Sequence, residues 1–352
     1  MKQYSIAFLC TICVGTAVFL YLQTEPPHLK WNANSCWNNS TFQVLRNIWP
    51  LTEALLEARK AAIKNKTTSP YELNDDGNKN DFMVAYVDLL ELTVPHKNMS
   101  DDEKKELEEK RDKFHLESCR LHTGEGFTYK VNEENIGIES ASGLDPATFF
   151  VDNIAGKNGA IATSKKIAEL FYSFLKMKIK NEKSIAHQIE SSLLTIYYGY
   201  DDYYKVLPGN KFEGYNTFEE LSDYFILCFF STEATINITK NLDLKPYVSE
   251  ALKKESWDYE LIGIVEGGSS HVKAYIKDQF KEKPEWWFCD DLTGTYKPKT
   301  PELEKLQKFD GEIHRYVGIF IAVYKRIKTS KKNEDKTIDD FAAALANIGS
   351  KK

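Results

Sequence analysis

The stretch "YELIGIVEGGSSHVKAYIKD", residues 259–278, decides the fold. Two runs rich in apolar and β-branched residues flank "EGGSS", a turn of small residues. This pattern predicts two antiparallel strands joined as a hairpin. His271 opens the second arm. An imidazole at a strand edge, beside small residues, is accessible to a substrate.

Two more apolar runs follow the hairpin. "EWWFCDDLTGTYKP", residues 285–298, predicts a strand leading into a turn, and "YVGIFIAVYKR", residues 316–326, predicts a last strand. If the first of these strands pairs with the hairpin, Asp290 or Asp291 can hydrogen-bond His271 and fix its tautomer. The alternative is that the two aspartates simply form part of a turn.

The earlier part of the chain has mainly helical patterns. Apolar residues at helical spacing predict one or two amphipathic helices over residues 40–64 and a further helix over 164–180. Residues 82–94 are apolar enough for a buried element. Residues 100–114, "SDDEKKELEEKRDKF", predict a helix with a Ser/Asp start and a solvated charged face.

Composition limits the class of protein. The chain has 352 residues, 42% of them hydrophobic, which is enough for one large domain or two ordinary ones. It has 46 basic and 52 acidic residues, so no basic excess indicates nucleic-acid binding. The spacing of the cysteines favours reduced thiols over a disulfide framework. The six are Cys10, Cys13, Cys36, Cys119, Cys228 and Cys289.

The N-terminus carries an uncharged apolar segment, "IAFLCTICVGTAVFLYL", residues 6–22, after a short tail of residues 1–5. This length is short for a transmembrane helix and long for the core of a signal peptide. The following "QTEPPHLK" has no convincing cleavage site. We therefore expect an uncleaved single-span anchor, with a cleaved signal sequence as the alternative.

A polar stretch, "NANSCWNNSTFQVL", residues 32–45, surrounds Cys36 and precedes a helical pattern. The start of a helix favours the thiolate and predicts a lowered pKa for Cys36, as a nucleophile needs. An inert, partly buried cysteine is the alternative. A thiol nucleophile also needs a base, for which His271 is the candidate. The chain has six other histidines, most of which are expected at the surface or at helix ends. They are His28, His96, His115, His122, His187 and His314.

These motifs, in this order, resemble the ubiquitin-specific proteases, papain-like thiol hydrolases that remove ubiquitin from proteins. "NSCWNNSTFQ", residues 34–43, is similar to the family's cysteine box. Residues 242–248, "LDLKPYV", and the hairpin are similar to its histidine region, and residues 286–291, "WWFCDD", to its aspartate box. The resemblance covers residues 29–326.

The resemblance implies an α+β papain-like fold. A helical, thumb-like N-terminal part would precede a β-rich, palm- and fingers-like C-terminal part. The sequence pattern itself adds the transmembrane helix before both parts and a charged tail with a short helix over residues 327–352. It also implies the roles of the site residues. Cys36 is the nucleophile, His271 the general base and acid, and Asp290 the group that orients His271. The supporting residues are Asn34, Gln43 and Asp291.

Departures from the family pattern leave the activity open. Trp31 stands where the family usually has the oxyanion asparagine, and Asn32, one residue later, is the candidate substitute. Ala33 replaces a glycine, and Ser270 and Val272 flank His271 in place of glycine and tyrosine. The implied function is a deubiquitinating thiol protease, with a catalytically inactive ubiquitin-binding relative as the alternative.

The implied partners are ubiquitin or ubiquitinated proteins, and a membrane through the N-terminal helix. No cofactor is implied, and no metal is expected because the cysteine pairs of the family's zinc site are missing. The predicted location is a mitochondrial outer or endoplasmic reticulum membrane with the catalytic domain in the cytosol; a secreted or lumenal protein is the alternative. Glycosylation sequons occur at Asn38, Asn39, Asn65, Asn98 and Asn237.

Overall fold

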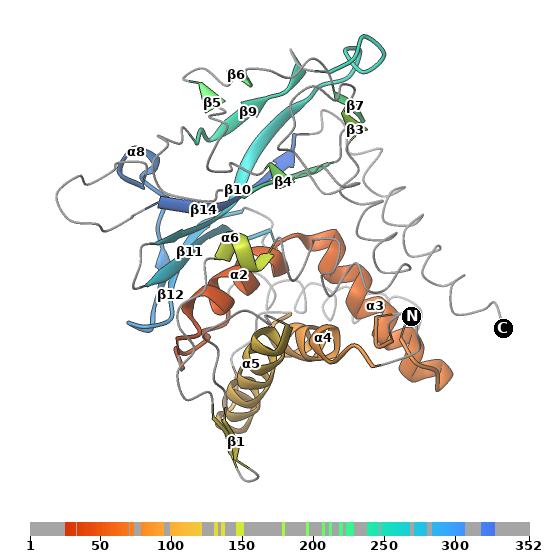
Figure 1. Cartoon of the computed structure of the whole chain (residues 1–352), viewed down its shortest axis with the longest axis vertical. Coiled ribbons are helices and arrows are strands. Elements are labelled where there is room, and N and C mark those ends of the chain that lie inside the picture. The colour runs from red at the N-terminus through yellow and green to blue at the C-terminus, as the bar shows by residue number, and fades with distance from the viewer. Residues whose placement is uncertain are drawn as a thin grey trace, which may run out of the picture.

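The computed structural model arranges the chain as helices on one side and a large sheet on the other (Figure 1). It describes residues 25–121 except 33, 70, 74–78 and 95–98, short segments between 130 and 228, and residues 238–327 except 246–247, 268–270, 280–283 and 307–317. The expected helices at 164–180 and in the 327–352 tail therefore lie outside the described residues, apart from the strand at 178–179.

Four long helices come first among the described residues. They are α2 (Cys36–Arg46), α3 (Trp49–Asn65), α4 (Asp81–Thr93) and α5 (Asp101–Leu121). Residues 40–64 thus fall in two helices, since the chain breaks at 47–48 and Pro50 lies in the first turn of α3, where its missing N–H costs nothing. A capping box starts α5: the Ser100 hydroxyl accepts from the Glu103 N–H, and the Glu103 carboxylate accepts from the Ser100 N–H. The short helices are α6 (Pro146–Phe149) and α8 (Leu303–Leu306).

The large sheet has the strand order β13-β12-β11-β10-β14-β8-β4, with β9 also paired to β10. All its pairs are antiparallel except β4–β8. Its strands are β4 (Thr195–Ile196), β8 (Tyr224–Cys228), β9 (Asn241–Asp243), β10 (Asp258–Gly267), β11 (Val272–Lys277), β12 (Trp286–Asp290), β13 (Thr295–Pro298) and β14 (Gly318–Arg326). The predicted hairpin and the two strands that follow it are confirmed.

Three small two-stranded sheets complete the described strands. They pair β1 (Lys130–Asn132) with β2 (Asn135–Gly137), β3 (Lys178–Ile179) with β7 (Phe218–Glu220), and β5 (Val206–Leu207) with β6 (Lys211–Phe212).

Helix α2 lies between the sheet and the other helices (Figure 1), and all eleven of its residues are buried. It contacts β10, β11 and β12 on one side and α3, α5 and α6 on others. Gly263 in β10 permits this close approach, because a Cβ there would lie 3.0 Å from the Val44 side chain. A second apolar cluster, which includes Leu244, Trp257 and Leu261, packs around β9, β10 and β14.

The C-terminal end of α2 is attached to the sheet by the fully buried Asn47. Its Nδ2 donates to the carbonyl oxygens of Ile262 (3.1 Å) and Lys277 (2.9 Å), and its Oδ1 accepts from the Gln279 N–H (3.0 Å). One side chain therefore pairs three main-chain groups, on β10, at the end of β11 and just beyond it.

None of the helices in the described part of the chain combines the length and the apolar character that crossing a bilayer requires. The predicted fold class, with a transmembrane helix before a papain-like domain, is therefore contradicted, as is the predicted single-pass membrane location. That prediction rested on the hydropathy of residues 6–22, which lie outside the described residues. The described chain instead has four long helices and a mainly antiparallel sheet.

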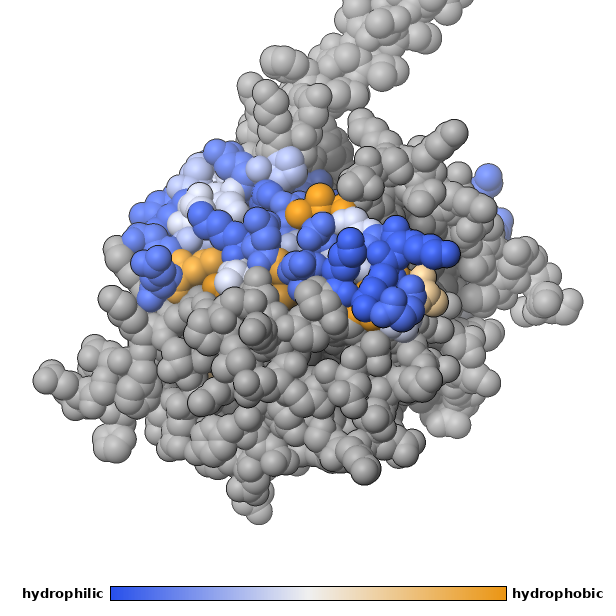
Figure 2. Space-filling model, turned by 90° about the horizontal axis from the view of Figure 1, so that it is seen from above, coloured by the Kyte–Doolittle hydropathy of each residue, from blue (hydrophilic) through white to orange (hydrophobic). Residues whose placement is uncertain are grey.

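The described surface is mostly hydrophilic where Figure 2 shows it, with small, separate apolar areas. Few large apolar side chains are exposed among the described residues. They are Trp31, Ile63, Leu73, Leu292 and Ile327.

Replacing Asn47 with alanine tests the attachment of α2. Asn47→Ala removes three hydrogen bonds, one of them to the buried carbonyl oxygen of Ile262, and leaves a small cavity, so we expect a loss of about 2–4 kcal/mol in the free energy of unfolding. Urea unfolding followed by tryptophan fluorescence measures it. The control Asn65→Ala changes an exposed residue at the end of α3 and should shift stability by less than about 0.5 kcal/mol. Equal effects of the two changes would contradict the assigned role.

Candidate active site

Cys36 is the first residue of α2, and its side chain is buried. Its sulfur accepts a hydrogen bond from the backbone N–H of Val272, the residue that follows His271. The structure therefore brings the predicted nucleophile to the start of β11, across more than two hundred residues of sequence. The backbone N–H groups of Cys36 and Trp37, in the first turn of the helix, also face the sulfur.

His271 and Asp290 form a hydrogen-bonded pair because β11 and β12 are neighbours in the sheet. His271 Nε2 lies 2.8 Å from Asp290 Oδ1. Burial would raise the pKa of the Asp290 carboxyl, but hydrogen bonds from His271 and from the Thr293 N–H hold it below its ordinary value. Since an ionised carboxylate only accepts, Nε2 is the ring nitrogen that donates in this pair, and Nδ1 is the nitrogen left to act as a base. Nδ1 is buried and has no hydrogen-bond partner among the described residues.

Gly267, at the end of β10, fixes the main chain beside His271. A Cβ at this position would lie 2.3 Å from the carbonyl oxygen of His271 and 2.8 Å from the Cα of Val272. Neither atom can move away cheaply, because both belong to the backbone of the paired strand. A glycine is therefore required here for the hairpin to present His271.

Asp291 follows Asp290 directly in the chain and is also buried. The Asn39 side chain of α2 donates to Asp291 Oδ2 at 2.7 Å, while Asp291 Oδ1 has no partner among the described residues. Burial raises the pKa of Asp291 to about 6, despite the opposing effects of Asn39 and His271. The backbone of Asp291 also holds the segment before the helix, because its carbonyl oxygen accepts from the Trp31 N–H at 3.2 Å.

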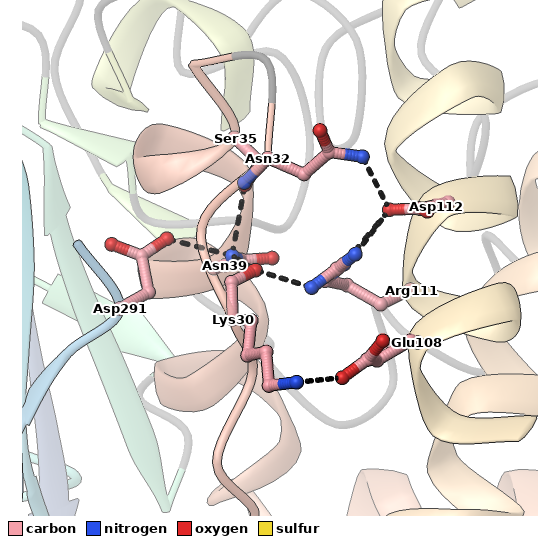
Figure 3. Close-up of polar contacts among 8 residues, drawn as sticks. All are labelled: Lys30, Asn32, Ser35, Asn39, Glu108, Arg111, Asp112 and Asp291. Carbon is pink, nitrogen blue, oxygen red and sulfur yellow. Dashed lines mark hydrogen bonds and ion pairs between the residues drawn. The ribbon is translucent and has the colours of Figure 1, made fainter. Parts of the chain in front are cut away.

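Helix α5 holds the chain just before Cys36 (Figure 3). Arg111, which is buried, donates to the carbonyl oxygen of Lys30 at 2.5 Å and to Asp112. Asn32, the candidate oxyanion donor, directs its side-chain amide at Asp112 Oδ1, 3.0 Å away (Figure 3). The close-up shows this amide pointing away from Asp291, toward α5.

The remaining supporting residues have structural positions. Asn34 has a φ of 62°, a left-handed conformation that asparagine tolerates well, in the turn closed by the Ser35 N–H and the Asn32 carbonyl oxygen. Gln43, within α2, donates to the carbonyl oxygen of Pro27 at 2.8 Å and so ties down the segment before the helix. Ala33 and Ser270, two departures from the family pattern, lie outside the described residues.

Two predictions were wrong, one of a pKa and one of the exposure of a side chain. Burial dominates at Cys36 and raises its pKa to about 11, because it outweighs the N–H groups of Val272 and of the first turn of α2, which lower the pKa. His115 is not a surface residue, since it is fully buried on α5, where burial and the nearby Arg111 lower its pKa to about 3. Both errors have one cause: the degree of burial is set by distant segments that pack over the residue.

Arg111 and Asp112 were missed as site residues. Their segment has a high local charge, which predicts a solvated face, and nothing in the local pattern distinguishes them from their neighbours. The structure also bears on two sequons, because the side chains of Asn38 and Asn39 are buried and donate to Ser118 (2.7 Å) and Asp291 (2.7 Å). A glycan on either residue is incompatible with this fold.

Comparison with known proteins leaves the class of this chain open. No protein-family model matches the sequence, and no curated protein matches it either. The geometry around Cys36, His271 and Asp290 is therefore the basis for the function proposed below.

Replacing Asp291 with asparagine tests whether the buried charge of Asp291 destabilises the fold at neutral pH. Because its folded-state pKa is raised from 3.8 to about 6, the contribution of Asp291 to stability is greatest below pH 3.8 and is lost as the pH rises through 6. Asp291→Asn keeps an acceptor for Asn39 and removes the charge. We expect it to stabilise the fold by up to about 3 kcal/mol at pH 7 and by little at pH 4.

Urea unfolding between pH 4 and pH 8 measures this difference. Asp290→Asn is the matched control with the opposite sign: the lowered pKa of Asp290 gives stability above its ordinary pKa, so its loss should destabilise the protein at pH 7. A stability difference between Asp291→Asn and wild type that does not vary with pH would contradict the assignment.

The raised pKa of Cys36 predicts slow alkylation of the free protein. Only the thiolate reacts, so the rate for Cys36 should rise about tenfold per pH unit between pH 7 and pH 9 without levelling off. Iodoacetamide labelling with mass mapping of the Cys36 peptide measures this rate. A rate that is already level near pH 7 would instead indicate a preformed thiolate–imidazolium pair.

Proposed function

We propose that this chain is a cysteine-type hydrolase that cleaves the peptide or isopeptide bond after the C-terminal glycine of ubiquitin. One observation carries the chemical part: Cys36 accepts a hydrogen bond from the residue next to His271, while His271 Nε2 pairs with Asp290 at 2.8 Å. A nucleophile, a base and a group that orients the base are the parts that thiol catalysis needs. Ubiquitin as the substrate rests on the resemblance of the sequence motifs.

The free lone pair on His271 Nδ1 suits it to the role of base. In the proposed reaction the Cys36 thiol gives its proton to Nδ1, and the sulfur attacks the glycine carbonyl carbon. The imidazolium, stabilised by Asp290, then protonates the leaving amine as the C–N bond breaks. Water, deprotonated by His271, attacks the resulting thioester, and the protonated ring returns the proton to the leaving sulfur.

The first turn of α2 is the candidate oxyanion site. The N–H groups in the first turn of a helix favour negative charge, and those of Cys36 and Trp37 already face the sulfur. Asn32 can contribute only after its amide leaves Asp112. Trp31 and Leu292 are both exposed. The Trp31 N–H bonds the carbonyl oxygen of Asp291, the residue before Leu292, so the two apolar side chains belong to neighbouring segments. They offer apolar contact area for a bound protein beside the site.

A second candidate, an inactive ubiquitin-binding protein, is favoured by the state of Cys36. Its side chain is 6% exposed and its pKa is about 11, so the free protein holds a neutral, covered thiol. The same exposed Trp31 and Leu292 would serve binding without chemistry. The two candidates differ in whether a bound substrate uncovers and ionises Cys36.

Reaction with ubiquitin that carries a C-terminal electrophile tests the proposal. We expect a covalent adduct on the wild-type chain, none on Cys36→Ala, and an unchanged yield on Cys119→Ala, which truncates another buried cysteine. Hydrolysis of ubiquitin–rhodamine should fall about 100-fold or more in His271→Ala, because proton transfer is lost.

Each negative outcome has a definite meaning. No adduct on folded wild-type protein, with ubiquitin binding retained in solution, would select the inactive binding protein. An adduct that persists in Cys36→Ala would remove Cys36 as the nucleophile. Neither adduct nor binding would reject ubiquitin as the partner.

A further inference from the structure

We propose that Asp112 of α5, held by Arg111, is a positioning residue that keeps the Asn32 amide on α5 until a folded protein substrate is bound. We call Arg111 and Asp112 the clamp. This inference rests on the proposed function, because it gives Asn32 a role that only a working thiol hydrolase needs. The clamp would make hydrolysis depend on a folded substrate, and not only on the sequence of its C-terminus.

The clamp holds the Asn32 side chain with a charged acceptor. Asp112 Oδ1 accepts from Asn32 Nδ2 at 3.0 Å and from Arg111 at both Nε (2.9 Å) and Nη2 (2.5 Å) (Figure 3). Hydrogen bonds to a carboxylate are stronger than those between neutral groups. The two bonds from Arg111 also fix the position of this oxygen. The Asn32 amide is therefore directed at α5 in the free protein.

The main chain of Asn32 lies beside the start of α2. Its N–H donates to the Ser35 hydroxyl at 3.0 Å, and its carbonyl oxygen accepts from the Ser35 N–H at 2.9 Å. Ser35 directly precedes Cys36. A rotation of the Asn32 side chain, with these main-chain hydrogen bonds intact, therefore turns its amide from α5 toward the first turn of α2.

The bond between Asn32 and Asp112 is the contact of this set that opens most easily. Arg111 is 4% exposed, so its guanidinium depends on its acceptors, which are Asp112 and the Lys30 carbonyl oxygen at 2.5 Å. The Asp112 side chain, by contrast, is 31% exposed, so water can take the place of the Asn32 amide there. Release of Asn32 therefore leaves the carboxylate solvated and the arginine paired.

A folded substrate has a way to release the clamp. Trp31 directly precedes Asn32 and is 39% exposed, and Lys30 is exposed as well. A protein that packs on Trp31 therefore contacts the segment that carries Asn32. A short peptide that occupies only the position of the cleaved bond makes no such contact, and the clamp stays closed around it.

Hydrolysis of a large and a small substrate tests the clamp. Asp112→Asn removes the charge and keeps an oxygen for Arg111, so we expect kcat/KM for a short fluorogenic peptide with the C-terminal sequence of ubiquitin to rise about fivefold to tenfold. For ubiquitin–rhodamine, which releases the clamp by itself, the change should be less than about twofold. The control Glu109→Gln removes an exposed charge from the same helix and should change neither rate.

The gain should require Asn32. Asn32→Ala removes the oxyanion donor, so it should lower kcat for ubiquitin–rhodamine by about 100-fold. Adding Asp112→Asn to Asn32→Ala should then give no gain with the peptide. A purely structural effect of Asp112 would act in both backgrounds, so an equal gain with and without Asn32 would overturn the clamp.

An NMR signal reports the clamp without any turnover. In protein labelled with isotopic asparagine, the Asn32 side-chain resonance is identified by its loss in Asn32→Ala. We expect Asp112→Asn to shift this resonance and to increase the mobility of the Asn32 side chain, while the Asn47 side chain, which bonds the sheet, stays rigid. An Asn32 resonance that Asp112→Asn leaves unchanged would contradict the clamp.

The clamp and the proposed function fail in different ways. If wild-type protein hydrolyses ubiquitin–rhodamine but Asp112→Asn gives no gain with the peptide, the clamp fails and the proposed function stands. If no variant hydrolyses either substrate although Asp112→Asn frees the Asn32 side chain, the proposed function fails, and any role of the clamp in catalysis fails with it.

Discussion

The attachment of α2 to the sheet is the interaction on which the rest of the structure depends. Asn47 joins the end of the helix to main-chain groups of β10, of the last residue of β11 and of the chain just after it. At the other end, Asn39 donates to Asp291 just past β12. Gly263 allows the helix to lie close between these two attachments. Cys36 therefore has a defined position relative to His271 because the helix is held near both of its ends.

The site combines groups with conflicting requirements. The imidazole of His271 needs a carboxylate behind it, and Asp290 provides one at little electrostatic cost because it is well hydrogen-bonded. Asp291 is a second buried carboxylate that raises the energy of the site at neutral pH. Burial also keeps Cys36 protonated.

Local patterns predicted some of the fold correctly. Alternating apolar runs and a small-residue turn located β10 and β11, and the Ser100 cap located the start of α5. Strand pairing predicted that one of the two aspartates would reach His271, and the family resemblance indicated Asp290, which is the one that bonds it. What failed depends on distant packing: the burial of His115, the pKa of Cys36 and the hold of α5 on residue 30 cannot be deduced from neighbours in sequence. The membrane anchor rested on the hydropathy of residues 6–22 and on the lack of a cleavage site after them, and no helix of that kind occurs among the described residues.

Because α2 is completely buried, the cysteine motif that it carries can be retained for packing as well as for catalysis. Trp37 packs against Phe149, Asn38 bonds Ser118, and Gln43 bonds the Pro27 carbonyl oxygen, all without any part in chemistry. Natural selection for a stable fold alone would therefore retain most of "NSCWNNSTFQ" in a descendant that had stopped turning over substrate. Among relatives of this chain, presence of the motif would be a poor marker of catalysis. The few positions that serve only chemistry, beginning with the sulfur of Cys36, would be the informative ones.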